Sequence, residues 1–247
     1  MKMRREVEVC VISDVHLGSY GCHAKELNKY ITSINPQKLI LNGDIFDGYV
    51  FNKNYFPNEH IEFVRNVLTL LKDGTEVFYL VGNHDDFMRN FDEVSMLNLH
   101  KLDKLVLEID GKTCWFFHGD VFDISMRGDF GKVMAKIGGR AYDWIIVLNR
   151  FLNQFLKMLG RKPYSLSKKI KDSVKSAVKF VGDFEKMSCE HAIKQKYDYV
   201  INGHIHCPKI MEYKNVDGDV IYLNSGDWVE NLTSLEYNNG EWRIYHY

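Results

Sequence analysis

The chain has 247 residues, of which 45% are hydrophobic and 26% charged, and its formal net charge is −1. This length suits one large domain or two small ones, and the balance is that of a globular protein rather than a disordered or fibrous one. The near-zero charge gives no general signal for nucleic-acid binding. Five cysteines form an odd set without a C-x-x-C pair, which argues against a disulfide framework or a zinc ribbon and suits a reducing cytoplasm.

The first residues, MKMRREVEVCVISD, pass from charged side chains directly into a strand pattern, without the apolar region of a signal peptide. The longest wholly apolar run near the middle of the chain, WIIVL, is too short to span a bilayer. We therefore expect a cytoplasmic protein.

Short apolar runs rich in β-formers recur along the chain and predict strands, several of them covered on both faces. These runs are VEVCVIS, KLILN, EVFYLV, KLVLEI, TCWFFH, YDYVIN and DVIYLN. Between the early runs, helical periodicity predicts helices over 24–34 and 59–71. Asp110-Gly111 and Asn239-Gly240 each stand between β-rich runs and predict hairpin turns.

The middle of the chain differs in both pattern and charge. The segment 127–186 holds 14 basic and 5 acidic residues, whereas the rest holds 18 basic and 28 acidic ones. Its apolar residues recur at helical spacing over 144–159, and a second helix is predicted over about 165–196. We therefore expect one α/β domain with a helical insertion at about 127–194.

Five of the predicted strands end in carboxylate, amide or imidazole groups. They are Asp14 and His16 in DVHLGS, Asp44 and Asp47 in GDIFDG, Asn83, His84 and Asp85 in GNHDDF, His118 in HGD, and His204 and His206 in GHIH. One H-x-H pair alone could fill a polar pocket, but ligands of α/β sheets bind at the carboxyl ends of strands. Five such ends together favour one metal site.

The residue types restrict the metals. Carboxylate, amide and imidazole groups without a thiolate suit Mn, Fe, Co, Ni or Zn. These groups exceed the needs of one ion and match two ions that share a carboxylate, which is an arrangement used for phosphoester hydrolysis.

The five blocks, in this order from Asp14 to His206, resemble the calcineurin-like metallophosphoesterase superfamily. The resemblance implies a four-layer α/β/β/α fold with a helical cap, and a hydrolase that uses two divalent metal ions, manganese by preference, with iron or zinc as alternatives. It also implies the ligands: Asp14, His16 and His206 for the first metal, Asn83, His118 and His204 for the second, and Asp44 as the bridge.

The same resemblance assigns the catalytic pair. It implies that His84 donates to the substrate phosphate or leaving group and that Asp47 orients His84. Asp47 could instead cap a turn, and Asp85 could take its role or hold ligand histidines. We expect Asp120 to support a ligand residue by hydrogen bonding rather than to bind a metal itself.

Residues around these blocks are expected to have ordinary structural roles. Glycines 43, 82 and 203 are expected to allow sharp turns before the ligands. Five histidines outside the blocks are expected to be surface residues: His23, His60, His100, His191 and His246.

The course of the chain after the metal blocks, HGD…GHIHCP…YLNSGDWVEN, is similar to that of UDP-2,3-diacylglucosamine diphosphatases. This similarity implies hydrolysis of UDP-2,3-diacylglucosamine to UMP and 2,3-diacylglucosamine 1-phosphate, a step of lipid A synthesis, under a helical lid. His84 is a departure, because the best-described branch of that family has arginine there. A phosphodiesterase or phosphatase acting on another nucleotide, a phospholipid or a phosphoprotein therefore stays open, as does a non-catalytic metal-bound scaffold.

Lysines of the predicted second helix suggest a binding face. Lys171 and Lys175 lie four residues apart, on one face with Lys179, and could receive substrate phosphate or an anionic membrane surface, or simply be solvated. The expected partners are an anionic nucleotide-lipid and, by peripheral contact, the inner face of the cell membrane, but no nucleic acid.

Overall fold

The computed structural model describes residues 4–49, 55–91, 95–96, 98–122 and 168–247, with the backbone alone for 95–96 and 168–178. The chain forms two compact units, Met1–Val121 with Ser188–Tyr247, and Phe122–Met187. Both sheets belong to the first unit. In the second unit the described side chains include Phe122 and Phe184, whose rings pack edge to face at 5.9 Å.

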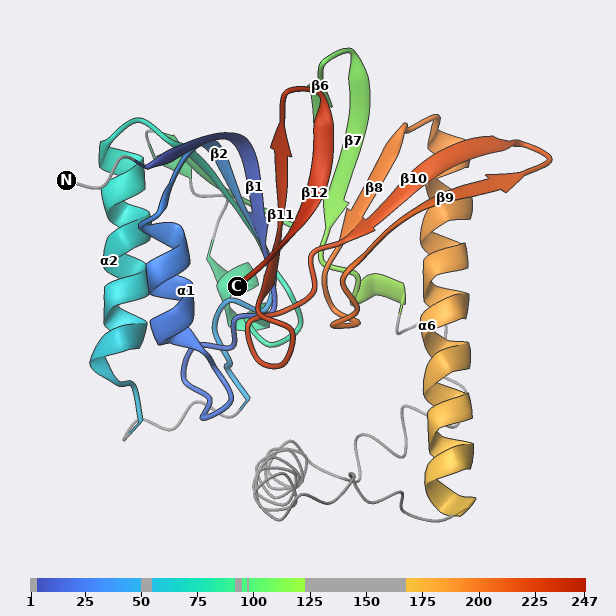
Figure 1. Ribbon diagram of the computed structural model, residues 1–247, viewed down its shortest axis with the longest axis horizontal. Coiled ribbons are helices and arrows are strands. Elements are labelled where there is room, and N and C mark those ends of the chain that lie inside the picture. Colours follow the sequence, from blue (N-terminus) through green and yellow to red (C-terminus); the bar gives the residue numbers. More distant parts are fainter. Residues whose placement is uncertain (1–3, 50–54, 92–94, 97, 123–167) are drawn as a thin grey trace. The chain divides into compact units, whose positions relative to one another are not determined.

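The first sheet has seven strands in the order β12-β11-β1-β2-β3-β5-β4 (Figure 1). Strands β1, β2, β3 and β5 are parallel, and the other three are antiparallel to their neighbours. The strands are β1 (Arg5–Ile12), β2 (Ile34–Asn42), β3 (Glu76–Leu80), β4 (Ser95–Met96), β5 (Leu99–Leu102), β11 (Thr233–Asn238) and β12 (Glu241–His246).

The second sheet has five strands in the order β6-β7-β8-β10-β9. Its three central strands are parallel, and the two edge strands are antiparallel. The strands are β6 (Lys104–Ile109), β7 (Lys112–Phe117), β8 (Tyr199–Asn202), β9 (Lys209–Asn215) and β10 (Gly218–Asn224).

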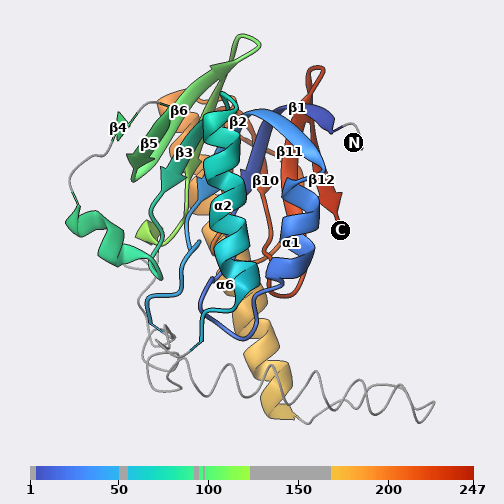
Figure 2. The same cartoon turned by 90° about the vertical axis from the view of Figure 1, so that its left-hand side faces the viewer.

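Two hydrophobic clusters hold these layers together. Side chains of α1 (Ala24–Ile31) and α2 (Asn58–Lys72), such as Leu27 and Phe63, pack on one face of the first sheet (Figure 2). The other face of that sheet contributes residues such as Val11 to a second cluster, where they meet Phe116 and other residues of the second sheet. Helix α6 (Lys168–Gln195) ends against the far face of the second sheet, where His191 contacts Trp115. The expected four-layer α/β/β/α arrangement is confirmed.

All seven predicted β-rich runs form strands, and both hairpin turns are confirmed. Asp110 and Gly111 have φ values of 49° and 72°, and Asn239 and Gly240 have 52° and 83°. Positive φ at both central residues is the geometry that a two-residue hairpin of this type requires. A short 3-10 helix, η1 (Asp86–Asn90), follows the GNHDDF block.

Some element boundaries were predicted wrongly. The first helix ends at Ile31 rather than at residue 34, because Ile34 already pairs with Arg5 in the first sheet. Pro36 also lies within β2, where it pairs with Val7. Strand β3 joins β2 only from Lys38 onward, so the missing N–H of Pro36 disrupts no ladder on that side.

The predicted insertion is described only in part. The second helix predicted over 165–196 is present as α6. The first predicted helix and residues 123–167 lie outside the described residues, as do the side chains of Lys171 and Lys175. The boundaries of the insertion and the role of these lysines stay predictions. Within the described part of the chain, no helix has the length and apolar character needed to cross a membrane.

Candidate metal centre

The predicted ligands follow strands of both sheets, and the loops that carry them are joined by hydrogen bonds. The Asp14 N–H donates to the carbonyl of Gly43, which joins the loops after β1 and β2. His118 Nδ1 lies 2.9 Å from the Asn42 carbonyl oxygen, which links the second sheet to the first. The Gly203 N–H donates to the His118 carbonyl and holds the loops after β7 and β8 together. Parallel strands in each sheet thus bring the five blocks to one place.

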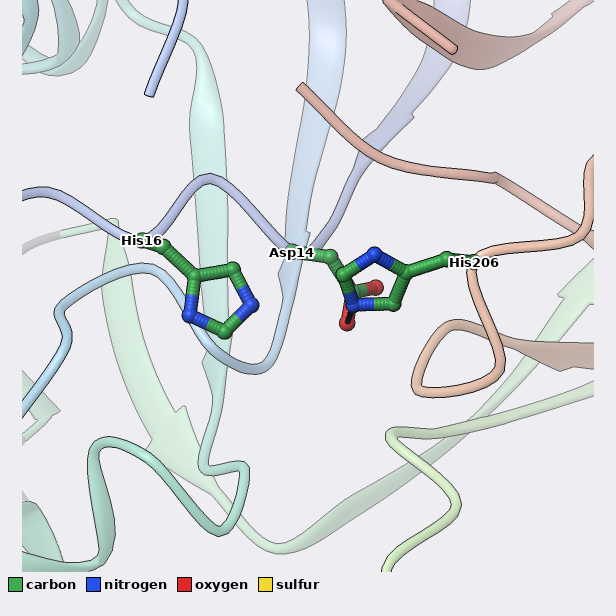
Figure 3. Close-up of side chains that lie close together, drawn as sticks. All are labelled: Asp14, His16 and His206. Atoms are coloured by element: carbon green, nitrogen blue, oxygen red, sulfur yellow. Dashed lines mark ion pairs between the residues drawn. The ribbon is translucent and has the colours of Figure 1, made fainter. Parts of the chain in front are cut away.

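Asp14, His16 and His206 form the first cluster. One candidate ligand atom from each lies within 4.8 Å of the others. His206 Nε2 is 3.1 Å from Asp14 Oδ1, and Figure 3 shows the His206 ring beside the Asp14 carboxylate. These are the three residues that the family resemblance assigns to one metal.

Asp44 lies between the first cluster and a second one. Its Oδ2 atom is 3.1 Å from His118 Nε2 and 3.9 Å from His16 Nε2. Asp44, His118 and His204 satisfy the same 4.8 Å criterion, and so do His16, Asp44 and His84. A carboxylate between imidazoles of both clusters is placed as a bridging ligand needs to be.

Several ligand atoms are buried without a hydrogen-bond partner. They are Asp14 Oδ1, His16 Nε2, Asn83 Oδ1 and His118 Nε2. Leaving a buried polar atom unsatisfied costs about 1–3 kcal/mol. Four such atoms, drawn from the predicted ligands of both metals, fit two cations, because coordination supplies the missing partner of each.

The backbone holds the ligands in an uncommon conformation. Of the nine described non-glycine residues with positive φ, five are predicted ligands: Asp14, His16, Asp44, His204 and His206, with φ between 48° and 65°. This region costs a non-glycine residue of order 1 kcal/mol or more and is concentrated at functional sites. The fold therefore accepts strain where these side chains are positioned.

The electrostatics of the centre favour bound cations. Burial opposes ionisation of Asp44, but attraction to His118 outweighs it and keeps the Asp44 pKa below its usual range. Burial likewise lowers the pKa of His206, yet attraction to Asp14 outweighs it and raises the pKa to about 9. The carboxylates thus stay ionised, and their negative charge favours the protonated form of the neighbouring imidazoles. Divalent cations between them would supply that charge instead.

The three glycines of the blocks lie against ligand side chains. A Cβ on Gly43 would lie 2.4 Å from the His118 ring, one on Gly82 2.2 Å from Asp44 Oδ1, and one on Gly203 2.5 Å from Asp14 Oδ2. Only Gly43 also has positive φ, at 84°. The predicted reason, a sharp turn, therefore applies to Gly43, whereas Gly82 and Gly203 are required by close approach.

His84 and Asp47 lie beside the centre. Asp47 Oδ1 is 3.1 Å from His84 Nδ1, and Asp47 Oδ2 is 3.5 Å from His16 Nδ1. Burial lowers the His84 pKa, but the hydrogen bond with Asp47 and the charge of Asp44 outweigh it and raise the pKa. His84 therefore keeps a proton to higher pH than an ordinary imidazole and is suited to donate to an anionic oxygen.

Asp85 supports the ligand loops instead of competing with Asp47. It accepts hydrogen bonds from the backbone N–H groups of Gly82 and Ile45 and from the Tyr79 hydroxyl. These contacts join the loop of Asn83 to the loop of Asp44. Asp120 belongs to none of the described candidate ligand groups, and it accepts a hydrogen bond from Arg89.

Two supporting residues were not identified from the sequence. His60 was expected at the surface, but it is buried, and its Nδ1 accepts a hydrogen bond from the Gly18 N–H, close to His16. Asp227 Oδ2 lies 3.8 Å from His206 Nδ1. The NSGDWVEN stretch could have indicated Asp227, because it supplies an acidic residue in a turn after a strand.

Comparisons with known proteins agree with this geometry. Residues 7–208 match the sequence model of the family described as calcineurin-like phosphoesterase. The DNA polymerase II small subunit of Thermoplasma acidophilum is 27% identical over 253 positions, which cover 90% of this chain and 45% of that protein. The chain thus spans less than half the length of this curated relative.

Two solved structures of low sequence identity are similar to this chain over most of its length. An archaeal phosphodiesterase is 15% identical, with 97% of this chain and 99% of that one covered and a TM-score of 0.46. A dimetal phosphatase from Danio rerio is 11% identical, with 96% and 95% covered and a TM-score of 0.44.

Proposed function

Because the chain belongs to the calcineurin-like phosphoesterase family and is a metal-dependent phosphoester hydrolase, we propose that it cleaves a phosphate linkage of a nucleoside-bearing substrate. The observation that carries this proposal is Asp44, whose carboxylate lies between imidazoles of two ligand clusters. When bound, a pair of divalent cations provides a nucleophile near neutral pH and neutralises phosphate oxygens.

The residues of the chain have distinct parts in this proposal. One cation would be held by Asp14, His16 and His206, and the other by Asn83, His118 and His204. Asp44 would bind both cations. His84, held by Asp47, would keep a proton on the side of the incoming phosphate and stabilise the charge that develops there.

The first candidate substrate is UDP-2,3-diacylglucosamine, whose pyrophosphate bond would be cleaved to give UMP and 2,3-diacylglucosamine 1-phosphate. The resemblance of the metal blocks and of the NSGDWVEN stretch to diphosphatases of lipid A synthesis supports this candidate. Peripheral contact with a membrane surface would follow from it, because the product keeps its acyl chains.

The second candidate is a phosphodiester bond of DNA, although the sequence led us to expect no nucleic acid. Similarity to a DNA polymerase II small subunit over 90% of this chain favours it. His84 weakens the first candidate, because the best-described branch of the lipid enzymes has arginine at this position.

One set of assays tests both candidates. Turnover of UDP-2,3-diacylglucosamine, of single-stranded DNA and of bis-p-nitrophenyl phosphate is measured with Mn²⁺, and Asp44→Asn is the control for contaminating hydrolases. We expect hydrolysis of the aryl diester and of one natural substrate, with loss of both in Asp44→Asn. No hydrolysis of any substrate by the metal-loaded protein would contradict the proposal.

A further inference from the structure

Four aromatic rings make successive contacts from the candidate metal centre to the exposed Tyr49. The centroids of His206 and His16 are 5.6 Å apart, those of His16 and His84 4.5 Å, and those of His84 and Tyr49 4.9 Å. The Tyr49 and His84 rings meet at 72°. Tyr49 is 70% exposed, so its ring offers a free face directly beside the residue proposed to contact the phosphate.

The loop that carries Tyr49 is fixed to His84. The Gly48 N–H donates to the His84 carbonyl at 2.8 Å, and the Tyr49 N–H donates to Asp47 Oδ1 at 3.2 Å. The Phe87 ring packs on this loop, since a Cβ on Gly48 would lie 3.0 Å from it. Phe87 is itself 44% exposed, so two aromatic side chains border the same stretch of backbone.

The charges near Tyr49 disfavour a second phosphate group there. Burial raises the pKa of the Tyr49 phenol, and the charge of Asp86 raises it further. Arg89 is shared between Asp86, Asp120 and Asp103, so acidic groups outnumber this one cation. An uncharged planar group fits this surface better than an anionic one.

We propose that Tyr49, with Phe87, binds the base of the nucleoside in the substrate. This inference rests on the proposed function, because the substrate phosphate must reach His84 for its nucleoside to reach Tyr49. Aromatic side chains bind bases through their faces with little dependence on sequence, and loss of one such contact weakens binding by about tenfold or more.

The test begins with binding, which does not depend on turnover. Calorimetry of the Mn²⁺-loaded protein compares thymidine 5′-monophosphate with 2-deoxyribose 5-phosphate, which lacks the base. We expect Tyr49→Ala to weaken thymidine monophosphate binding about tenfold and to leave deoxyribose phosphate unchanged, while Tyr49→Phe retains the affinity of the native protein. Equal binding of both compounds by the native protein, or equal weakening of both in Tyr49→Ala, would overturn the inference.

Turnover measurements distinguish base binding by Tyr49 from two other roles, which are positioning of His84 and binding of an acyl chain. The substrates are the p-nitrophenyl ester of thymidine 5′-phosphate, methyl p-nitrophenyl phosphate and hexadecyl p-nitrophenyl phosphate, which share a leaving group. We expect Tyr49→Ala to raise KM about tenfold for the thymidine ester alone. An equal loss of kcat on all three would mean that Tyr49 positions His84, and a loss confined to the hexadecyl ester would mean an acyl-chain site. Either result overturns the inference.

Tyr20→Ala is the matched control. Tyr20 is 60% exposed and also follows a metal-ligand loop, but its ring packs on Tyr55. We expect this variant to behave as the native protein in every assay. If the native protein hydrolyses none of the esters yet binds thymidine monophosphate through Tyr49, the proposed function fails and the base site stands.

Discussion

Asp47 and His84 are joined by a 3.1 Å contact, and their roles depend on one another. We expect His84→Ala to lower kcat about 100-fold or more, because a general acid contributes about that much. Asp47→Ala should cost about 10–100-fold, the usual loss when an orienting partner is removed.

The double variant tests whether the two residues act as a unit. We expect its activity to be close to that of His84→Ala, because Asp47 has no histidine left to orient. Both single variants should retain their bound metal by elemental analysis. If the kcat of the double variant is reduced by the product of the two single reductions, Asp47 acts independently of His84, for instance through His16.

The candidate ligands could be proposed from the sequence because each follows a strand within a short recognisable block. The supporting residues could not. Tyr49 and His60 have no motif of their own, and their positions depend on contacts with His84 and Gly18 that only the folded chain creates. The sequence indicated the three glycines that precede ligands. It could not show why Gly82 and Gly203 must be glycine, because the side chains that leave no room for a Cβ there are more than 30 residues away in the sequence.

The loop between β3 and η1 has no space for a side chain at Gly82. We expect Gly82→Ala to lower the free energy of unfolding by about 1–3 kcal/mol, because its Cβ would displace Asp44. Urea unfolding measures this effect. Gly182→Ala, in α6, makes the same chemical change where nothing lies within 4 Å, and it should be neutral or stabilising. Equal destabilisation by both variants would contradict the account.

The turn after β10 depends on Asp227. Its Oδ1 accepts hydrogen bonds from the backbone N–H groups of Val229, Glu230 and Asn231. The Asn231 side chain in turn donates to Asp227 and to the His206 carbonyl. We expect Asp227→Ala to cost about 1–3 kcal/mol in urea unfolding and to weaken metal binding, because three backbone N–H groups of the turn lose their acceptor.

Asp227→Asn is the matched variant for this turn. It keeps one oxygen acceptor and should recover most of the stability. If Asp227→Ala unfolds at the same urea concentration as the native protein, the turn does not depend on this carboxylate.

Strands with continuous apolar runs were predictable, including β6 at one edge of the second sheet, whereas β9 at the other edge was not. Strand β9 alternates half-buried and exposed residues and includes Glu212 and Lys214, so its composition does not distinguish it from a loop. Pairing with β10, rather than its own propensity, makes it a strand. The early end of α1 has the same origin, because pairing with β1 overrides the helical pattern at Ile34.

At the scale of the molecule, the candidate metal centre draws its residues from both sheets. Asp14, Asp44 and Asn83 follow strands of the first sheet, and His118 and His204 follow strands of the second. Mn²⁺ should therefore stabilise the protein by about 2.7 kcal/mol at 100 times its dissociation constant, since it binds only the folded state. Thermal unfolding with Mn²⁺ and with EDTA measures this effect, which should shrink in Asp44→Asn. An unchanged melting temperature would contradict it.

The order of the blocks was enough to predict the fold and to propose a metal centre, because this chemistry requires particular residues at fixed strand ends. The substrate was not predictable in the same way. It depends on surfaces around the centre, such as that of Tyr49, and these are formed by loops without a characteristic sequence.

The most direct test of the account is the number of metal ions that the native protein binds. Elemental analysis after loading with Mn²⁺ and removal of the excess should give two ions per chain, and one or fewer in Asp44→Asn. One ion or none in the native protein, or two in the variant, would contradict a dimetal centre that shares Asp44.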